Sequence, residues 1–207
     1  MHLSAPFVET DPAVQRGLIR EHPLGLLITS GPGGLMANPV PFVLVEDEGP
    51  LKLWCHLARD NAQLAELARV DTCLAVFSGP QAYVSPSWYA TKARTGAVVP
   101  TWNYAAVHLW GRPAIRDDGV WLRRQLRALT EQQERGRPEP WAVDDAPAAY
   151  IAALARGIVG VEIEVDRVEA KVKASQNRPA EDRAGVVEGL AAANPAMAAL
   201  VRQRGGD

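Results

Sequence analysis

Cysteine is scarce in this sequence, and long apolar runs are missing from it. The two cysteines, Cys55 and Cys73, are too few for a disulfide framework and lack the C-x-x-C spacing of redox and zinc motifs. Both lie in apolar, strand-like segments, so we expect buried free thiols. No apolar run approaches the roughly 20 residues that span a bilayer, and the N-terminus lacks the basic and apolar regions of a signal peptide. We therefore expect a cytoplasmic protein without a membrane partner.

Net charge of either sign is also small. The 22 Lys and Arg residues against 24 Asp and Glu residues give −2, and 47% of the residues are hydrophobic, which is typical of a globular protein with a sizeable core. This balance excludes a disordered chain, a collagen and a protein that binds nucleic acid through overall basicity. The charge is unevenly placed, since residues 51–112 carry +3 and residues 167–207 carry +2. An anionic ligand is best sought at these two segments, although most such segments are solvated surface.

Glycine and proline divide the apolar runs into short segments. The hydrophobic pattern predicts a β-rich α+β fold, with an antiparallel meander, a hairpin turn at 31–34 and a helical C-terminal segment. We expect strands at residues 24–29, 35–45, 51–57, 72–78, 101–115 and 158–165. We expect helices at residues 12–22, 60–69, about 118–134, a segment ending near 157, and most of 180–204.

Signatures of common enzyme classes are missing. The glycines at 31–34 join two expected strands and do not open a helix, so a dinucleotide fingerprint is excluded. Four histidines at wide spacing give no metal-binding motif, and no G-x-S-x-G motif surrounds Ser85 or Ser87. We therefore expect no metal site, and catalytic residues stay unassigned.

A first candidate site lies where an expected strand runs into a helix start. His56, Arg59 and Asn61 follow one another at this junction. Free backbone N–H groups and the helix dipole favour a phosphate at such a position. The alternative interpretation is structural, with Asp60 capping the helix and Arg59 as a surface charge.

A second candidate site combines aromatic and polar residues. The segments 83–89 and 99–104 interleave Trp and Tyr with Ser, Thr and Asn, where a core strand would carry Val and Ile. This pattern is typical of the lining around a flat heteroaromatic ligand, although a structural aromatic cluster would look similar. Residues 171–178 add a dense polar group after an expected strand.

Together, the segments 79–89, 99–108, 157–160 and Ser175-Gln176-Asn177-Arg178 resemble the PaiB family of FMN-binding negative transcriptional regulators. The resemblance extends over nearly the whole chain. It implies an FMN-binding split β-barrel, similar to pyridoxamine phosphate oxidase, with peripheral helices. It also implies a homodimer with two FMN sites at its interface. The expected division is a split-barrel domain over 1–179, with a helical insert at about 118–156, and a helical segment over 180–207.

The resemblance implies roles for particular residues. Asn38 and the residues from His56 to Asn61 would meet the ribityl phosphate, Thr101 to Asn103 would approach the flavin ring or ribityl chain, and Ser175 to Arg178 would close the site. The implied cofactor-binding set is Asn38, His56, Ala58, Arg59, Asn61, Ser87, Trp88, Thr101, Trp102, Asn103, Ser175, Gln176, Asn177 and Arg178. Two positions depart from the family pattern: Pro39 where a His is frequent and Cys55 where a Gly is frequent. Pro39 removes two hydrogen-bond donors and weakens the expectation of tight flavin binding.

Three functions follow as hypotheses. The first is an FMN-binding regulator of the PaiB type, for which DNA as a partner rests on the family resemblance alone. The second is a flavin-dependent oxidoreductase on a small substrate, with Tyr89, Tyr104 or His108 as candidate proton donors. The third, weaker hypothesis is haem binding or degradation through His56 or His108. Arg123, Arg124 and Arg127 are the nearest approach to a basic recognition helix, but a solvated helix face explains them better.

Overall fold

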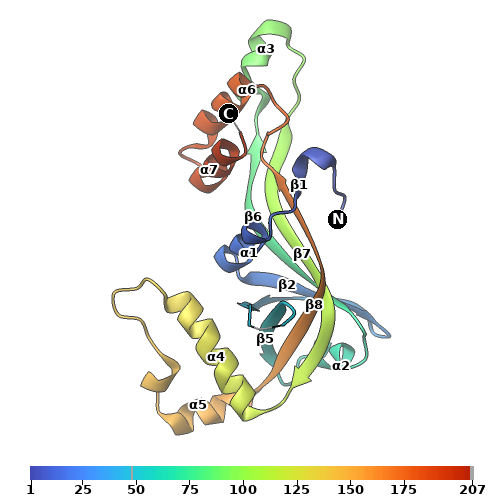
Figure 1. Cartoon of the computed structure of the whole chain (residues 1–207), viewed down its shortest axis with the longest axis vertical. Coiled ribbons are helices and arrows are strands. Elements are labelled where there is room, and N and C mark those ends of the chain that lie inside the picture. The colour runs from blue at the N-terminus through green and yellow to red at the C-terminus, as the bar shows by residue number, and fades with distance from the viewer. Residues whose placement is uncertain (48, 206–207) are drawn as a thin grey trace. The chain divides into compact units, whose positions relative to one another are not determined.

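Antiparallel strands form the framework of the computed structural model, which describes residues 1–47 and 49–205 (Figure 1). Within this part of the chain, eight strands share one sheet, in the order β3-β2-β6-β7-β8-β5-β4, with β1 paired to β8. The chain divides into two compact units. The first comprises Met1–Glu21, Ser78–Val107 and Glu169–Asp207, and the second comprises His22–Phe77 and His108–Val168. The long strands β6 (Cys73–Val84), β7 (Thr101–Arg116) and β8 (Ile158–Lys173) contribute to both units.

Hairpins and antiparallel neighbours build the second unit. Strands β2 (Leu24–Gly31) and β3 (Gly34–Pro41) form the predicted hairpin, in register from Leu24 opposite Pro41 to Gly31 opposite Gly34. Strand β5 (Lys52–Ala58) pairs with β8 on one side and with β4 (Val43–Val45) on the other. The described part of this unit is completed by the helices α2 (Gln63–Leu67), α4 (Gly119–Glu134) and α5 (Ala148–Ala155) and by the 3₁₀ helix η3 (Val143–Asp145).

The alternation of side chains along β5 decides what faces the core and what faces α4. Leu53, Cys55 and Leu57 are buried, as expected for one face of a strand. On the other face, Trp54 packs against Trp121 of α4, with ring centroids 5.3 Å apart. Helix α4 therefore covers the side of β5 that carries the candidate residue His56.

Helices surround the strand ends that belong to the first unit. Strand β1 (Val8–Glu9) pairs with β8, and helix α1 (Pro12–Glu21) follows it. The remaining elements are the 3₁₀ helices η1 (Ala5–Phe7) and η2 (Pro86–Trp88), with helices α3 (Ala90–Thr95), α6 (Ala180–Leu190) and α7 (Pro195–Gln203). Figure 1 shows α6 and α7, in red, packed beside each other.

The structure confirms the α+β class, the antiparallel sheet and the helices after residue 180. It also confirms that Cys55 and Cys73 are buried free thiols. The expected division at residue 179 stays a prediction, and residues 206 and 207 of its second part lie outside the described residues. No helix in the described part is long and apolar enough to span a membrane.

Several predicted bounds were wrong. The expected strand 35–45 breaks between β3 and β4, and the expected helix 60–69 shrinks to α2. Strands β6 and β8 run much further than the expected ends at 78 and 165. Strand β7 passes without interruption through Gly111, where a Cβ atom would lie 2.2 Å from the carbonyl oxygen of Glu164. Glycine at this position permits the close approach of the β8 backbone.

Candidate functional site

The predicted residues of the first unit gather where β7 begins and β8 ends. Lys173, the last residue of β8, donates hydrogen bonds from Nζ to the hydroxyl of Thr101 and, over 2.8 Å, to the carbonyl oxygen of Trp102. These contacts hold the end of β8 beside the start of β7. Thr101, Trp102 and the segment after Lys173 therefore lie close together in the folded chain.

A buried hydrogen bond joins the next residues of this site. Asn103 is fully buried and donates from Nδ2 to Ser175 Oγ over 2.8 Å. Ser175 has a φ of 60°, in the left-handed region, which turns the chain sharply after β8. The Oδ1 atom of Asn103 has no hydrogen-bond partner within the described residues. An unpaired buried acceptor is costly, so a donor that reached this oxygen would stabilise the folded chain.

Two exposed aromatic rings, those of Trp102 and Tyr83, lie beside each other next to these residues. Trp102 is 49% exposed and Tyr83 is 48% exposed, with their ring centroids 6.1 Å apart. The indole Nε1 of Trp102 donates to Gln81 Oε1 over 3.1 Å, which holds the ring in position. Exposed, positioned aromatic surfaces are suited to stacking on a planar ligand.

Three cationic side chains accompany the rings. Lys171 lies 5.5 Å from the ring centroid of Tyr104, and Arg178 lies 4.8 Å from that of Tyr89. Among the described residues, neither these two nor Lys173 forms an ion pair with a carboxylate. Burial lowers the pKa of Lys173, and the neighbouring charges of Lys171 and Arg178 lower it further. The site therefore holds positive charge that no carboxylate contact compensates.

Other predicted residues of this unit have local structural roles. Gln176 Oε1 accepts from the backbone N–H of Ala174 over 2.7 Å, and its Nε2 donates to the carbonyl oxygens of Pro6 and Val172. Ser87 accepts from Lys92 Nζ over 3.1 Å. Asn177 is exposed.

Trp88 also has a packing role. Cβ atoms added at Gly185 and Gly189 of α6 would lie 1.9 Å from the Trp88 carbonyl oxygen and 2.4 Å from its indole ring. Close packing against this helix therefore accounts for Trp88 without a ligand.

The predicted residues of the second unit divide into two groups. In the first, Asn38 Nδ2 donates to Gln63 Oε1 over 2.9 Å, and Asn61 Oδ1 accepts from the backbone N–H of Gln63 over 2.9 Å. Gln63 is fully buried and also donates to the carbonyl oxygen of Leu27. Asn38 and Asn61 are thus brought together through Gln63, which the sequence analysis missed. Asn61, and not Asp60, accepts a backbone N–H at the start of α2.

The second group lies at the end of β5. His56 Nδ1 is 2.9 Å from Oε1 of the buried Gln125 on α4, and Ala58 is exposed. Arg59 forms a two-pronged ion pair with Asp117, with N–O distances of 2.6 and 2.8 Å, and donates to the carbonyl oxygens of Arg156 and Ile158. The hydrogen bonds that Arg59 donates to the Asp117 carboxylate raise the pKa of Arg59. The charge expected to meet a phosphate is therefore already matched by a carboxylate.

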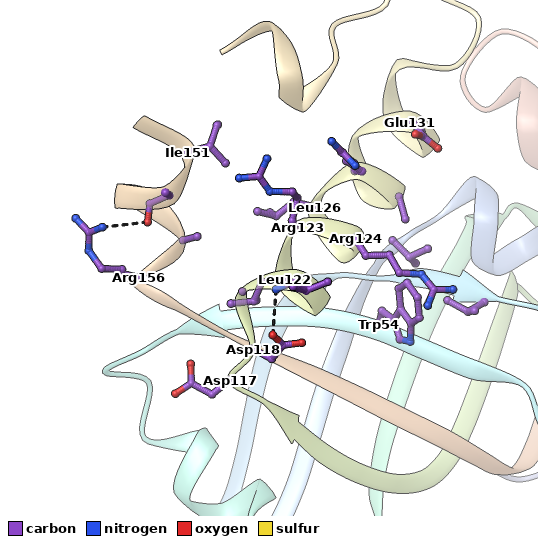
Figure 2. A pocket seen from close by; sticks show the side chains of 18 of the residues that line it. Trp54, Asp117, Asp118, Leu122, Arg123, Arg124, Leu126, Glu131, Ile151 and Arg156 are labelled. Atoms are coloured by element: carbon purple, nitrogen blue, oxygen red, sulfur yellow. Dashed lines mark hydrogen bonds between the residues drawn. The ribbon is translucent and has the colours of Figure 1, made fainter. Parts of the chain in front are cut away.

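A cavity of about 1130 Å³ lies in the second unit, between α4, α5 and the segment around β4 (Figure 2). Figure 2 shows Arg124 of α4 reaching over Trp54, and its guanidinium lies 4.8 Å from the Trp54 ring. Charged residues of both signs line the cavity: Glu46, Asp47, Arg59, Asp117, Asp118, Arg123, Arg124, Arg127, Glu131 and Arg156. The mixed lining gives this cavity no clear preference for an anion.

The residues of the first unit fit FMN. A flavin mononucleotide needs cations for its phosphate, flat surfaces for its ring and hydrogen-bond partners for the ring edge. This unit offers uncompensated cations, the exposed rings of Trp102 and Tyr83, and the unpaired Oδ1 of Asn103. Lys173 belongs to the polar group at residues 171–178 that the sequence indicated, but it was not part of the cofactor-binding set that the resemblance implied.

Comparison with known proteins assigns the family. Residues 1–167 match the model of the family described as "Putative FMN-binding domain", so the chain belongs to this family of FMN-binding proteins. The chain is 30% identical over 190 residues to the protease synthase and sporulation protein PAI 2 of Bacillus subtilis, covering 92% of this chain and 89% of the relative. The resemblance to the PaiB family is thereby confirmed, with FMN as the cofactor.

Two further similarities extend this assignment. An uncharacterized protein of Emericella nidulans is 35% identical over 245 residues, covering 99% of this chain and 98% of the relative. The FAD and heme binding protein of Mycobacterium smegmatis shares the fold with a TM-score of 0.59 at 19% identity, covering 80% of this chain and 73% of that one. The expected split-barrel architecture is confirmed, with a sheet whose strand order is open among the described residues.

Proposed function

We propose that this flavoprotein uses bound FMN for electron transfer with a small substrate. The observation that carries the proposal is the grouping of exposed aromatic rings with uncompensated cations in one unit. Trp102 and Tyr83 would stack on the flavin ring, and Asn103 Oδ1 would accept a hydrogen bond from its edge. Thr101, Ser175 and Arg178 of the implied cofactor-binding set stay a proposal as well.

The protein's part in this function is binding, orientation and electrostatics. When bound, FMN would supply two-electron redox chemistry between a reduced nicotinamide and an acceptor, with the proton released to solvent or passed to the acceptor. Positive charge near the ring would raise the reduction potential of a bound flavin. Lys173 and Arg178 would supply that charge, while the hydrogen bond from Trp102 to Gln81 keeps the stacking surface in place.

The test is anaerobic stopped-flow reduction of the FMN-loaded protein by NADH or NADPH. We expect reduction faster than that of free FMN, and a loss of flavin affinity in Trp102→Ala that Trp102→Phe largely restores. Reduction no faster than that of free FMN would contradict the oxidoreductase proposal. Gln203→Ala, an exposed change on α7, serves as the matched control.

A second candidate function is transcriptional repression, which rests on the resemblance to the PaiB family of FMN-binding negative transcriptional regulators. Direct DNA binding through α4 has little support. Arg127 pairs with Asp144 over 2.6 Å, Arg123 lies 3.9 Å from the same carboxylate, and Arg124 stacks over Trp54. DNA from upstream of the protein's own gene, titrated at several salt concentrations, decides the question. Affinity that falls steeply with salt supports repression through DNA contact, and undetectable binding removes it.

We also propose a homodimer in which FMN contacts come from both subunits. Sedimentation velocity of the FMN-loaded protein is expected to give twice the 22.4 kDa mass of one chain. A monomer that retains FMN would contradict this arrangement.

Titration with haem tests the hypothesis of haem binding. That hypothesis requires a Soret shift that is lost in His56→Ala or His108→Ala.

A further inference from the structure

We propose that Lys173, Lys171 and Arg178 form an oxyanion site that binds a phosphate monoester. This inference rests on the proposed flavin site in the same unit, but it concerns the charged end of the ligand. It differs from the sequence-based expectation, which placed the phosphate at His56 to Asn61. Neither Lys173 nor Lys171 was among the residues implied by the family resemblance.

Geometry brings the three cations together. Lys171 and Lys173 are two residues apart on β8, so their side chains leave the same face of the strand. Arg178 follows after the turn at Ser175, whose left-handed backbone reverses the chain direction. The turn is fixed by Gln176, which accepts from the N–H of Ala174, and by the N–H of Arg178, which donates to the carbonyl oxygen of Ser175 over 2.9 Å.

The contacts of these cations are with neutral groups. Lys171 Nζ donates to the carbonyl oxygen of His2 over 3.0 Å and lies near Tyr104. Lys173 donates to Thr101 and Trp102, and Arg178 covers the ring of Tyr89. The nearby acids have other contacts: Glu181 pairs with Arg94, and Asp182 accepts from the backbone N–H of Thr91. Three like charges held close together without a paired carboxylate repel one another, and a bound dianion removes this cost.

The contrast with Arg59 strengthens the assignment. Arg59 is held by both oxygens of Asp117 and by two carbonyl oxygens, so a phosphate there would have to displace an existing ion pair. Helix α2, which begins nearby, has only five residues and offers a weak dipole. At Lys173 a phosphate would displace no carboxylate, and the hydroxyl of Thr101 stands beside the ammonium group as a further donor.

Two ligands carry the same chemistry: FMN itself and a separate phosphorylated substrate. The affinities of FMN and riboflavin distinguish them, because the two flavins differ by the phosphate alone. We would measure both by fluorescence titration for the wild-type protein, Lys173→Gln and Arg178→Gln, with Lys173→Arg as the conservative variant. Arg202→Gln removes one exposed charge of the same unit away from the cluster and serves as the matched control.

We expect Lys173→Gln and Arg178→Gln each to weaken FMN binding about tenfold or more, the effect of losing one charge-assisted contact, with riboflavin affinity unchanged. Lys173→Arg and Arg202→Gln should keep the preference for FMN. Unchanged riboflavin binding also shows that the variants fold. Arg59→Gln should leave the preference intact, whereas a loss of the preference in Arg59→Gln alone would overturn the assignment.

Calorimetric titration of the FMN-loaded protein with inorganic phosphate tests whether the site binds a separate phosphorylated substrate. Phosphate binding that leaves FMN in place and disappears in Lys173→Gln supports the site as one for a separate phosphorylated substrate. If neither FMN preference nor phosphate binding changes in Lys173→Gln and Arg178→Gln, the oxyanion site is wrong. Failure of the wild-type protein to bind either flavin would instead contradict the proposed function, and the phosphate titration would still test the site.

Discussion

Asn103 donates a hydrogen bond to Ser175 across 2.8 Å, from a buried position near the start of β7 to the turn that follows β8. The two residues are 72 positions apart in the sequence. Their contact fixes the turn that places Arg178 after Lys173, and it orients the Asn103 amide so that Oδ1 stays free. The candidate site therefore depends on a contact between two residues that are both buried.

This hydrogen bond can be weighed with a double-mutant cycle. Ser175→Ala and Asn103→Ala should each lower the free energy of unfolding by about 1–3 kcal/mol, because each leaves a buried partner unsatisfied. The double variant should cost less than the sum of the two single changes. Urea unfolding measures all three, and strictly additive losses would show that the two side chains are not coupled.

The packing of Trp88 against α6 predicts that alanine at Gly185 and alanine at Gly17 change the stability of the protein in opposite directions. Gly185→Ala would place a Cβ atom 1.9 Å from the Trp88 carbonyl oxygen, so we expect a loss of about 1–3 kcal/mol or more. Gly17 in α1 is the matched control, since no atom lies within 4 Å of its added Cβ atom. Gly17→Ala should raise stability by up to about 1 kcal/mol, as expected for a helix interior. Equal effects of the two changes in thermal unfolding would contradict this packing.

The thiols should be inert in the native protein. Burial raises the pKa of the Cys73 thiol to about 12, and burial together with Cys73 raises the pKa of Cys55 as well. Neither thiol is then ionised at pH 8, and both are shielded from solvent. Ellman's reagent should react with no thiol in the native state and with two in guanidinium chloride. Rapid reaction of a native thiol would show that the core opens there.

Glu162 should make stability depend on pH. Burial alone would raise the pKa of its carboxyl group, but hydrogen bonds from Arg116 over 2.6 Å and from Trp54 over 2.8 Å outweigh burial and lower it. A lowered pKa in the folded state gives stability that is present above the unfolded value of 4.5 and is lost as the pH falls through the folded value. Glu162→Gln should therefore cost about 1 kcal/mol at pH 7 and progressively less below about pH 4.5.

Urea unfolding at pH 7 and pH 3 measures this dependence. Glu164→Gln, an exposed change on the same strand, is the control and should be nearly neutral at both values. A cost of Glu162→Gln that stays the same at pH 3 would show that the charge of Glu162 plays no part.

Local patterns predicted the element types well because they depend on near neighbours. Apolar periodicity and proline placed α1, and the glycines at 31–34 placed the turn of the β2–β3 hairpin. The continuation of β8 beyond Val165 was missed because Asp166 and Arg167 interrupt the apolar run. Buried Ala170 and Val172 show that the alternation resumes after them.

The candidate site was predicted only in part, for a different reason. Residues close in sequence, such as Thr101 and Asn103, were found from their composition. The neutralisation of Arg59 was not, because Asp117 lies 58 positions away and reaches it only in the folded chain. The cover of His56 by Gln125, 69 positions away, was missed for the same reason.

The central claim is that this chain binds FMN through the rings and cations of its first unit. FMN titration of the purified protein, followed by flavin fluorescence, tests it most directly. We predict saturable quenching at one FMN per chain, weakened by both Trp102→Ala and Lys173→Gln and unaffected by Arg202→Gln. Wild-type protein that leaves the fluorescence of added FMN unchanged, or binding that both variants retain in full, would contradict the account.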